Sequence, residues 1–416
     1  MLRKINSANL AAVAFLFTII AASTSLTDST ITRNAFYLAI FFAIIAFIVS
    51  KPWTLSRDAT LISIAILCIG LSQAVWLWRF PSPGELTTHS QYLTSSTRLL
   101  CGAILVITLG SLQSTISHRV KNFSKGLLVF GFFYTSSIGI YLHVQSPDVR
   151  LEINTVATIT AYIYTLQSLL TIYVINNTSW RYKSIIMLVV IVLSIWVLFL
   201  TQTRTTLLIY PVLLLLFFCR RQHLKMKTIL VFSLLITLMA AATSYLFTTA
   251  TERLANTVNE ISNYQKGNGD SSLGSRISMW KAGIHAIEQA PNGQNATNRF
   301  DITRQYINHH EGGNQEALRN IVYHLHNDFI ESGSLQGITG ILALFFFFAL
   351  ISTATIRYMQ SRTVLLFLIF PTFIIGTVDT LFIDHRFVTN LTLMLAIYLS
   401  LQPSRQRVSG AGIQEN

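Results

Sequence analysis

The chain has 416 residues, of which 52% are hydrophobic and only 11% are charged. Soluble globular proteins carry about 25% charged residues, so this composition excludes an ordinary water-soluble domain. In a soluble protein the net charge of +13 would indicate a nucleic-acid partner, but here the basic residues flank long apolar segments. We therefore expect a membrane protein that binds no nucleic acid.

The apolar residues form blocks long enough to cross the roughly 30 Å hydrocarbon core as α-helices. Helices satisfy their own backbone hydrogen bonds within a bilayer, and the alternating strands of a barrel are not visible in the sequence. The sequence therefore predicts an all-α, polytopic membrane protein with about twelve spans. The predicted spans are 9–25, 34–50, 59–77, 98–113, 126–142, 154–175, 184–200, 205–219, 228–248, 337–356, 363–378 and 386–401.

The basic residues between the spans predict the orientation. With the N-terminus in the cytoplasm, the inner loops and termini carry seventeen Lys and Arg, whereas the short outer loops carry six. An excess of Lys and Arg in short cytoplasmic loops is the rule for membrane proteins. Both termini are therefore predicted to be cytoplasmic.

One long polar segment, 249–336, lies on the outer side and holds five of the ten histidines. We expect a helix from about 275 to 290, an irregular tract over 294–313 whose role stays open, and a second helix over 317–332. Polar loops of this length are usually functional. The predicted divisions are transmembrane helices one to nine in 1–248, the large loop in 249–336, helices ten to twelve in 337–403 and a cytoplasmic tail in 404–416.

Two arginines are candidates for binding an anion. Arg204 lies in a short turn between two apolar spans, where it would either snorkel at the interface or bind a headgroup-level phosphate through its planar guanidinium. Arg276 lies in the first turn of the helix expected from 275, where a cation opposes the helix dipole. It is either a solvated surface residue or a ligand for an anionic partner.

His326 is the candidate general base, because a neutral imidazole can accept a proton from a hydroxyl nucleophile. An ordinary interfacial histidine is the alternative. On a continuous helix His324 would point about 200° away from His326, so we do not expect both rings to serve one site. His324 and Asn327 adjoin it in the sequence, and Asp328 and Glu331 could orient it or remain solvated.

Two further groups of residues follow. Gly333, Gly337 and Gly340 form a small-residue row, for which close helix packing is the expected role. Four ionisable residues gather in the last outer loop and would either border the same cavity as His326 or neutralise one another. They are Asp379, Asp384, His385 and Arg386. The sequence contains no Walker motif, glycine-rich nucleotide loop or paired metal-ligand spacing, so we expect no nucleotide, metal or other cofactor.

At these positions the sequence resembles the bacterial O-antigen ligases of lipopolysaccharide assembly, particularly those of enterobacteria. Arg204 with Leu208 is similar to the family's Arg-x3-Leu motif, and His326 with Gly333 is similar to its His-x7-Gly motif. The segment 273–276, followed by Trp280, resembles the family's second arginine segment. The twelve-span layout with a long loop before the last spans agrees as well.

The resemblance implies a metal-independent, membrane-embedded glycosyltransferase of GT-C-like fold in the bacterial inner membrane, with its active site facing the periplasm. It would transfer O-antigen from undecaprenyl diphosphate to a sugar hydroxyl of lipid A–core, among membrane lipids. Arg204 and Arg276 would bind the diphosphate, and His326 would be catalytic. O-antigen polymerases and protein O-oligosaccharyltransferases, which belong to the same superfamily, remain the nearest alternatives. A transporter is disfavoured because the spans contain almost no ionisable residues at mid-membrane.

Overall fold

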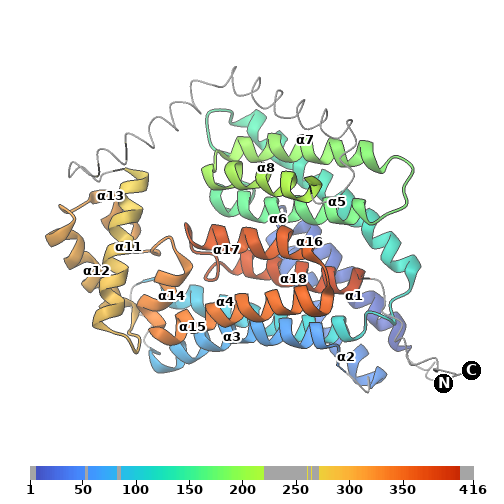
Figure 1. The fold of residues 1–416 in the computed structure, drawn as a ribbon, viewed down its shortest axis with the longest axis horizontal. Helices are drawn as coiled ribbons and strands as arrows, with labels where there is room; N and C mark the ends of the chain where they lie inside the picture. Colours follow the sequence, from blue (N-terminus) through green and yellow to red (C-terminus); the bar gives the residue numbers. More distant parts are fainter. Residues whose placement is uncertain are drawn as a thin grey trace, which may run out of the picture.

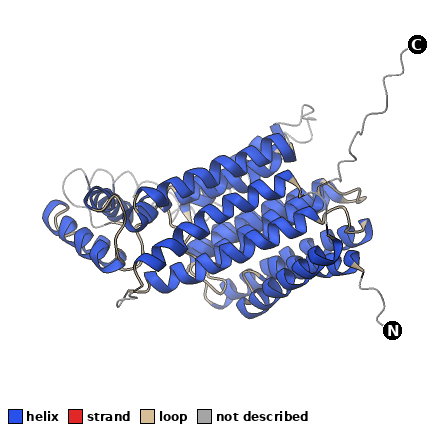
Figure 2. Ribbon diagram, turned by 90° about the horizontal axis from the view of Figure 1, so that it is seen from below, coloured by secondary structure: helices blue, strands red, loops and turns tan. Residues whose placement is uncertain are grey.

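The computed structural model describes residues 6–51, 55–81, 86–219, 260, 264 and 271–402. Within these residues the secondary structure is helical, and they contain no strand (Figure 2). The first helices are α1 (Ser7–Thr24), α2 (Ser29–Ser50), α3 (Arg57–Arg79), α4 (Thr88–Ser111), α5 (His118–Gln145), α6 (Ala157–Asn176), α7 (Lys183–Thr201) and α8 (Arg204–Cys219). The later ones are α11 (Ser272–Gln289), α12 (Ala296–His310), α13 (Gln315–Asn320), α14 (Asp328–Gln336), α15 (Ile338–Thr353), α16 (Arg362–Val364), α17 (Phe370–Gly376) and α18 (His385–Leu401), with π-helical turns η1 (Ala354–Met359) and η2 (Leu365–Ile369).

Eight of the described helices are long and apolar enough to cross a membrane, namely α1 to α7 and the continuous helix Ile338–Met359. Two shorter apolar helices, α8 and Arg362–Gly376, and α18 coincide with three more of the expected spans. The all-α polytopic membrane fold is therefore confirmed. The expected span 228–248 and the tail 404–416 lie outside the described residues.

The helices form a bundle with two central members. Figure 1 shows α16 to α18 between α5 to α8 on one side and α3, α4 and α15 on the other. Nearly every residue of α6 and α18 is buried, as expected for helices that are surrounded by others on all sides. Large apolar side chains such as Phe41, Trp78 and Phe130 are exposed on the outside of the bundle, where lipid would cover them. The two central helices, α6 and α18, therefore hold the residues at their ends in fixed positions.

Helices α11 to α13 form a separate group beyond one end of the bundle (Figure 1). Met279, Ile307, Ile321 and Leu325 belong to a small apolar core of this group. Helix α11 ends at Gln289, so the helix expected from 275 to 290 is present.

Two expectations for this region were wrong. The tract 294–313 is not irregular but contains α12, because Asn295 caps its first turn and Arg299, Thr303 and Ile307 recur every four residues on one buried face. The expected helix 317–332 is interrupted: α13 ends at Asn320 and α14 begins at Asp328. The side-chain cap of Asn327 and the left-handed backbone at His326 explain this interruption.

Candidate active site

A cavity of about 550 Å³ lies at the N-terminal ends of the two central helices. Thr158 and Ile159 of α6 and the first residues of α18 form part of its wall, together with the segments around residues 323–326 and 379–384. Apart from Tyr323, the ionisable residues that line it are His324, His326, Asp379, Asp384, His385 and Arg386. The structure therefore brings His326 and the charged cluster of the last loop to the same cavity.

His326 and Asp379 form a directly bonded pair at this cavity. The His326 Nδ1 atom lies 2.9 Å from Asp379 Oδ1, and the side chains are 21% and 4% exposed, respectively. Asp379 also accepts hydrogen bonds from the Tyr162 hydroxyl at 2.8 Å and from the Thr380 backbone N–H at 2.9 Å. Hydrogen bonds with His326, Tyr162 and Thr380 therefore hold the Asp379 carboxylate beside the imidazole.

The charge of Asp379 fixes the proton arrangement of the His326 ring. Burial raises the pKa of Asp379, but the hydrogen bond from His326 and the positive charges of His326 and Arg276 outweigh burial and hold that pKa well below its ordinary value. An ionised carboxylate only accepts hydrogen bonds, so His326 Nδ1 must donate. In the neutral ring this leaves Nε2 unprotonated, which is the state of a general base.

His324 lies against His326 and does not point away from it. The two ring centroids are 4.2 Å apart and nearly perpendicular, so the expectation that the histidines would face opposite directions was wrong. It assumed a continuous helix, whereas residues 321–327 are not helical. Burial, and then the charge of His326, lowers the pKa of His324 to about 3. His324 is therefore neutral at neutral pH and a weak base.

The backbone at His326 is left-handed, with a φ of 51°, a conformation uncommon for a residue other than glycine. Two side chains hold it. Trp280 of α11 donates its indole N–H to the His326 carbonyl at 3.1 Å. Asn327 accepts the backbone N–H groups of Phe329 and Ile330 as the cap of α14, and its amide donates to the Thr377 carbonyl at 2.8 Å. Asn327 thus starts α14 and joins it to the segment that carries Asp379.

Asp328 and Glu331 accept backbone hydrogen bonds from the segments that carry Asp379 and His326, respectively. Asp328 Oδ1 accepts the backbone N–H groups of Leu381 and Phe382 at 2.8 and 3.1 Å. Burial raises the pKa of Asp328 well above its ordinary value, although these two hydrogen bonds oppose the shift. Glu331 Oε2 accepts the Leu325 N–H at 2.9 Å, and Leu325 immediately precedes His326 in the chain. Glu331 therefore contacts the backbone beside His326 and not the ring itself.

The glycines have different roles from one another. A Cβ atom at Gly333 would come within 2.7 Å of Ile287 Cδ1, so this position allows α14 to approach α11 closely. Gly337 has a φ of +70° and separates α14 from α15, and a Cβ there would clash with the Pro291 carbonyl. Gly340 packs against the Ser332 carbonyl. The three glycines thus serve close packing, and Gly337 also supplies a turn.

Arg204 begins α8 directly after the short turn that follows α7. Its guanidinium pairs with Glu260 at 3.3 Å, and the Arg204 side chain is 40% exposed. The other oxygen of Glu260 accepts the Leu273 N–H in the first turn of α11, so one carboxylate joins the starts of α8 and α11. Tyr162, the partner of Asp379, also lies within hydrogen-bonding reach of Thr205, the residue after Arg204.

Arg276 is half-buried on α11, and its positive charge lowers the pKa of both Asp379 and His324. Within the described residues neither Arg276 nor Arg204 lines the 550 Å³ cavity itself. The two arginines thus lie on elements that adjoin the His326–Asp379 pair. Arg276 acts on the pair through its charge, whereas Arg204 is paired with Glu260.

Two side chains that support this arrangement have no signal in the sequence. Tyr162 lies within an apolar span, and Arg299 lies in the polar tract around 294–313. Arg299 is completely buried and donates to Glu331 Oε2 at 3.0 Å. A tyrosine in an apolar span and an arginine in a polar tract are both common. Only the tertiary contacts of Tyr162 and Arg299 show that these two residues support the site.

Three donor atoms, one each from His324, His326 and Asp379, lie within 4.8 Å of one another, a spacing that could hold a metal ion. Ligation through His326 Nδ1 would require its hydrogen bond to Asp379 to break, whereas ligation through Nε2 would not. Two His and one carboxylate would suit zinc or iron. The hydrogen-bonded pair by itself matches the histidine–carboxylate arrangement of general-base sites.

The bundle of apolar helices and the histidine–carboxylate cavity at one of its ends define a polytopic membrane protein with a built polar site. Residues 189–345 match the O-antigen ligase family, an interval that contains Arg204, Arg276 and His326. The chain is also 26% identical over 305 residues to the O-antigen ligase of Escherichia coli strain K12, which covers 70% of each chain. The chain is thus similar to O-antigen ligases, both in the family model over residues 189–345 and in this relative.

Proposed function

We propose that the protein is a glycosyltransferase that transfers O-antigen polysaccharide from undecaprenyl diphosphate to a hydroxyl of lipid A–core. The observation that carries the proposal is His326 at the cavity wall with the ionised Asp379 bonded to its Nδ1. This leaves Nε2 as the atom able to accept a proton from a hydroxyl. The similarity to O-antigen ligases supports a polysaccharide donor and a lipid A–core acceptor.

In the proposed reaction, the acceptor oxygen attacks the anomeric carbon of the donor sugar. The new carbon–oxygen bond forms as the bond from that carbon to the phosphate oxygen breaks, with inversion. The acceptor proton passes to His326 Nε2, and undecaprenyl diphosphate leaves with the electron pair. Asp379 stabilises the imidazolium that results, because its carboxylate lies 2.9 Å from Nδ1. Because both substrates are anchored in the same membrane plane, they lose less translational and rotational entropy when they meet than two substrates free in solution would.

The donor diphosphate is assigned to Arg204 and Arg276. A planar guanidinium binds two phosphate oxygens at once, and two such groups would offset the charge that grows on the leaving diphosphate. The Arg204 guanidinium forms an ion pair with Glu260 in this structure, so the diphosphate would replace that carboxylate. This charge stabilisation is the role that a divalent ion has in other transferases, and we propose that no metal is required.

The orientation is part of the proposal. The excess of Lys and Arg in alternate loops supports two cytoplasmic termini, so the cavity would face the periplasm of a bacterial inner-membrane protein. The arrangement of a polar site at one end of apolar helices supports a GT-C-like, membrane-embedded transferase.

The test is transfer in vitro with purified protein, lipid-linked O-antigen and purified lipid A–core, followed by gel mobility of the product. His326→Ala and Arg204→Ala should abolish transfer, and Arg204→Lys should be impaired because lysine lacks the bidentate fork. His309→Ala, an exposed residue of α12, is the matched control and should leave transfer unchanged. A chelating agent should have no effect.

Wild-type rates in His326→Ala would overturn the catalytic assignment. Loss of transfer on chelation, with recovery when a divalent ion is added, would overturn metal independence. Chain growth on the donor in the absence of lipid A–core would instead identify a polymerase. Movement of donor across liposomes without a new glycosidic bond would identify a transporter.

A further inference from the structure

A second cavity, of about 490 Å³, lies at the opposite end of the same two central helices. The candidate active site adjoins the first residues of α6 and α18, whereas this cavity adjoins Asn177, directly after α6, and Leu401 and Gln402 at the end of α18. A helix of twenty residues is about 30 Å long. The two cavities are therefore separated by the thickness of the bundle and do not share residues.

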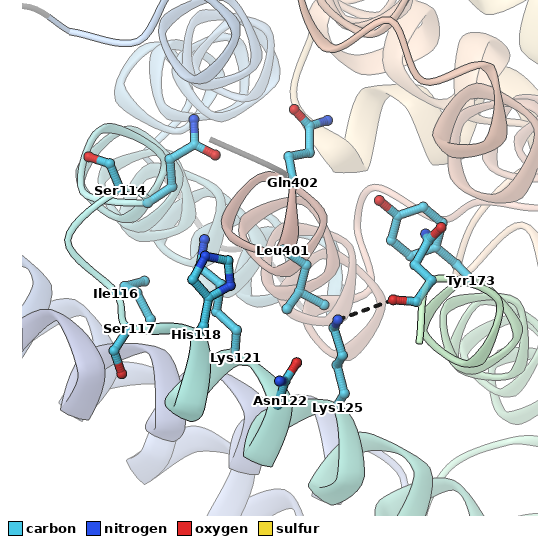
Figure 3. A pocket seen from close by; sticks show the side chains of 12 residues that line it. Ser114, Ile116, Ser117, His118, Lys121, Asn122, Lys125, Tyr173, Leu401 and Gln402 are labelled. Atoms are coloured by element: carbon cyan, nitrogen blue, oxygen red, sulfur yellow. Dashed lines mark hydrogen bonds between the residues drawn. The ribbon is translucent and has the colours of Figure 1, made fainter. Parts of the chain in front are cut away.

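The charge of this second cavity is positive. Figure 3 shows His118, Lys121 and Lys125 from the start of α5 beside Leu401 and Gln402. Lysines are its only fully charged side chains, and no Asp or Glu is among the described residues that line it. The lining residues are Gln113, Ser114, Ile116, Ser117, His118, Lys121, Asn122, Lys125, Tyr173, Asn177, Leu401 and Gln402.

Lys121 is the residue that indicates a ligand. Lys121 is only 8% exposed, and its ammonium group forms neither an ion pair nor a hydrogen bond with any described residue. Lys125 differs, because its ammonium group donates to the Asn177 carbonyl at 3.2 Å (Figure 3). The charge of a lysine residue that is nine-tenths buried is costly unless an anion or a set of acceptors compensates it. A bound anion would provide that compensation.

Two uncharged side chains in the wall also lack partners. The Gln113 Oε1 and Gln402 Nε2 atoms are buried without a hydrogen bond within the described part of the chain. The amide nitrogen of Gln402 could donate to a phosphate oxygen, while the amide oxygen of Gln113 needs a donor such as a hydroxyl group. The wall thus offers cationic and neutral donors together with one free acceptor.

We propose that this cavity binds the phosphate of an anionic phospholipid headgroup, with Lys121 and Lys125 on the phosphate and Gln113 on a headgroup hydroxyl. The N-terminus of α5, which begins at His118, adds a favourable dipole for an anion. The cavity lies at the end of apolar spans, where headgroups are found, and Ile116, Tyr173 and Leu401 offer apolar contact to the glycerol region. Basic pockets between transmembrane helices are known to bind such headgroups.

Binding there would tie the start of α5 to the ends of α6 and α18. A ligand that binds only the folded protein stabilises it in proportion to the logarithm of its concentration. The assignment therefore predicts an effect on unfolding that is independent of the transfer reaction. This effect of lipid on unfolding depends on the positions of α5, α6 and α18 and not on the identity of the transferase substrate.

The test is the unfolding temperature of the full-length protein in neutral detergent with added phosphatidylglycerol, phosphatidylcholine or sodium phosphate at matched ionic strength. Phosphatidylglycerol should raise Tm in a saturable way, and phosphatidylcholine should not. In Lys121→Gln/Lys125→Gln the apparent affinity for phosphatidylglycerol should fall at least about tenfold. Lys121→Gln alone should unfold no earlier than wild type without lipid, because it removes an uncompensated buried charge.

Lys183→Gln is the matched control, since Lys183 is an exposed lysine at the start of α7 that does not line the cavity. It should respond to phosphatidylglycerol as wild type does. An equal rise in Tm for the double variant, or an equal effect of phosphatidylcholine, would overturn the proposal. If sodium phosphate alone gave the whole saturable rise, the phosphate would be bound as a free ion, and the lipid assignment would be wrong.

Discussion

Arg299 and Glu331 form an ion pair, 3.0 Å long, in which both side chains are completely buried. The glutamate oxygen that accepts from Arg299 also accepts the backbone N–H of Leu325. The pair therefore joins α12 and α14 to the residue that precedes His326. We infer that it positions the left-handed turn at His326, although neither side chain touches the imidazole.

Breaking this pair from either side should be strongly destabilising. Arg299→Gln or Glu331→Gln leaves one buried charge without its partner, which costs about 3–5 kcal/mol. The double variant Arg299→Gln/Glu331→Gln contains two neutral amides and should be less destabilised than the sum of the single changes. Unfolding of the three purified variants in detergent measures this coupling. Strict additivity would show that the two groups do not act as a pair.

The role of Asp379 can be tested by a change that keeps its shape. Asp379→Asn removes the charge that stabilises the His326 imidazolium, so kcat should fall about 100-fold or more, with a smaller change in KM. Tyr162→Phe removes one hydrogen bond to the carboxylate and leaves its charge, so its effect should be much smaller. Equal losses in both variants would indicate that the carboxylate acts through hydrogen bonding alone. Wild-type kcat in Asp379→Asn would exclude it from the reaction.

The sequence predicted the membrane spans because hydropathy over a helix length depends on local composition alone. It also placed Arg204 in the turn between two spans and the end of α11 near residue 290. The confirmed spans include helices such as α4, which begins ten residues before its apolar block because polar residues continue the helix beyond the expected membrane boundary. Such extensions depend on neighbouring helices and cannot be read from hydropathy.

The contacts around the site could not be predicted in the same way. His324 and His326 were assigned to opposite faces because a helical period was assumed where Asn327 instead caps a new helix. The capping preference of Asn was visible in the sequence, but it competed with a helix-forming neighbourhood. Arg299 and Tyr162 carried no signal, since an arginine in a polar tract and a tyrosine in a span are ordinary until their partners are known. Tertiary contacts decide these roles.

His324 should make the protein less stable in mild acid. Its pKa is lowered to about 3 in the folded protein, whereas that of an unfolded histidine is about 6.5. The unfolded chain therefore binds more protons between these values, and stability falls as the pH decreases below about 6.5, by at most about 1.4 kcal/mol per pH unit. His324→Gln removes this group and should flatten the decrease in Tm between pH 7 and pH 5. His309→Gln, at an exposed position, serves as the control, and an unchanged slope in His324→Gln would contradict the assignment.

Glu260 should compete with the donor for Arg204. The carboxylate lies 3.3 Å from the guanidinium, and because the arginine is 40% exposed the pair is worth no more than about 1 kcal/mol. Glu260→Gln weakens this contact but keeps an oxygen for the Leu273 N–H, so KM for the lipid-linked donor should fall by about two- to fivefold with little change in kcat. Initial rates at varied donor concentration measure this, with Glu316→Gln in the exposed α13 pair as the control. A rise in KM would instead mean that Glu260 holds Arg204 in its binding position, and that the diphosphate joins this ion pair without replacing it.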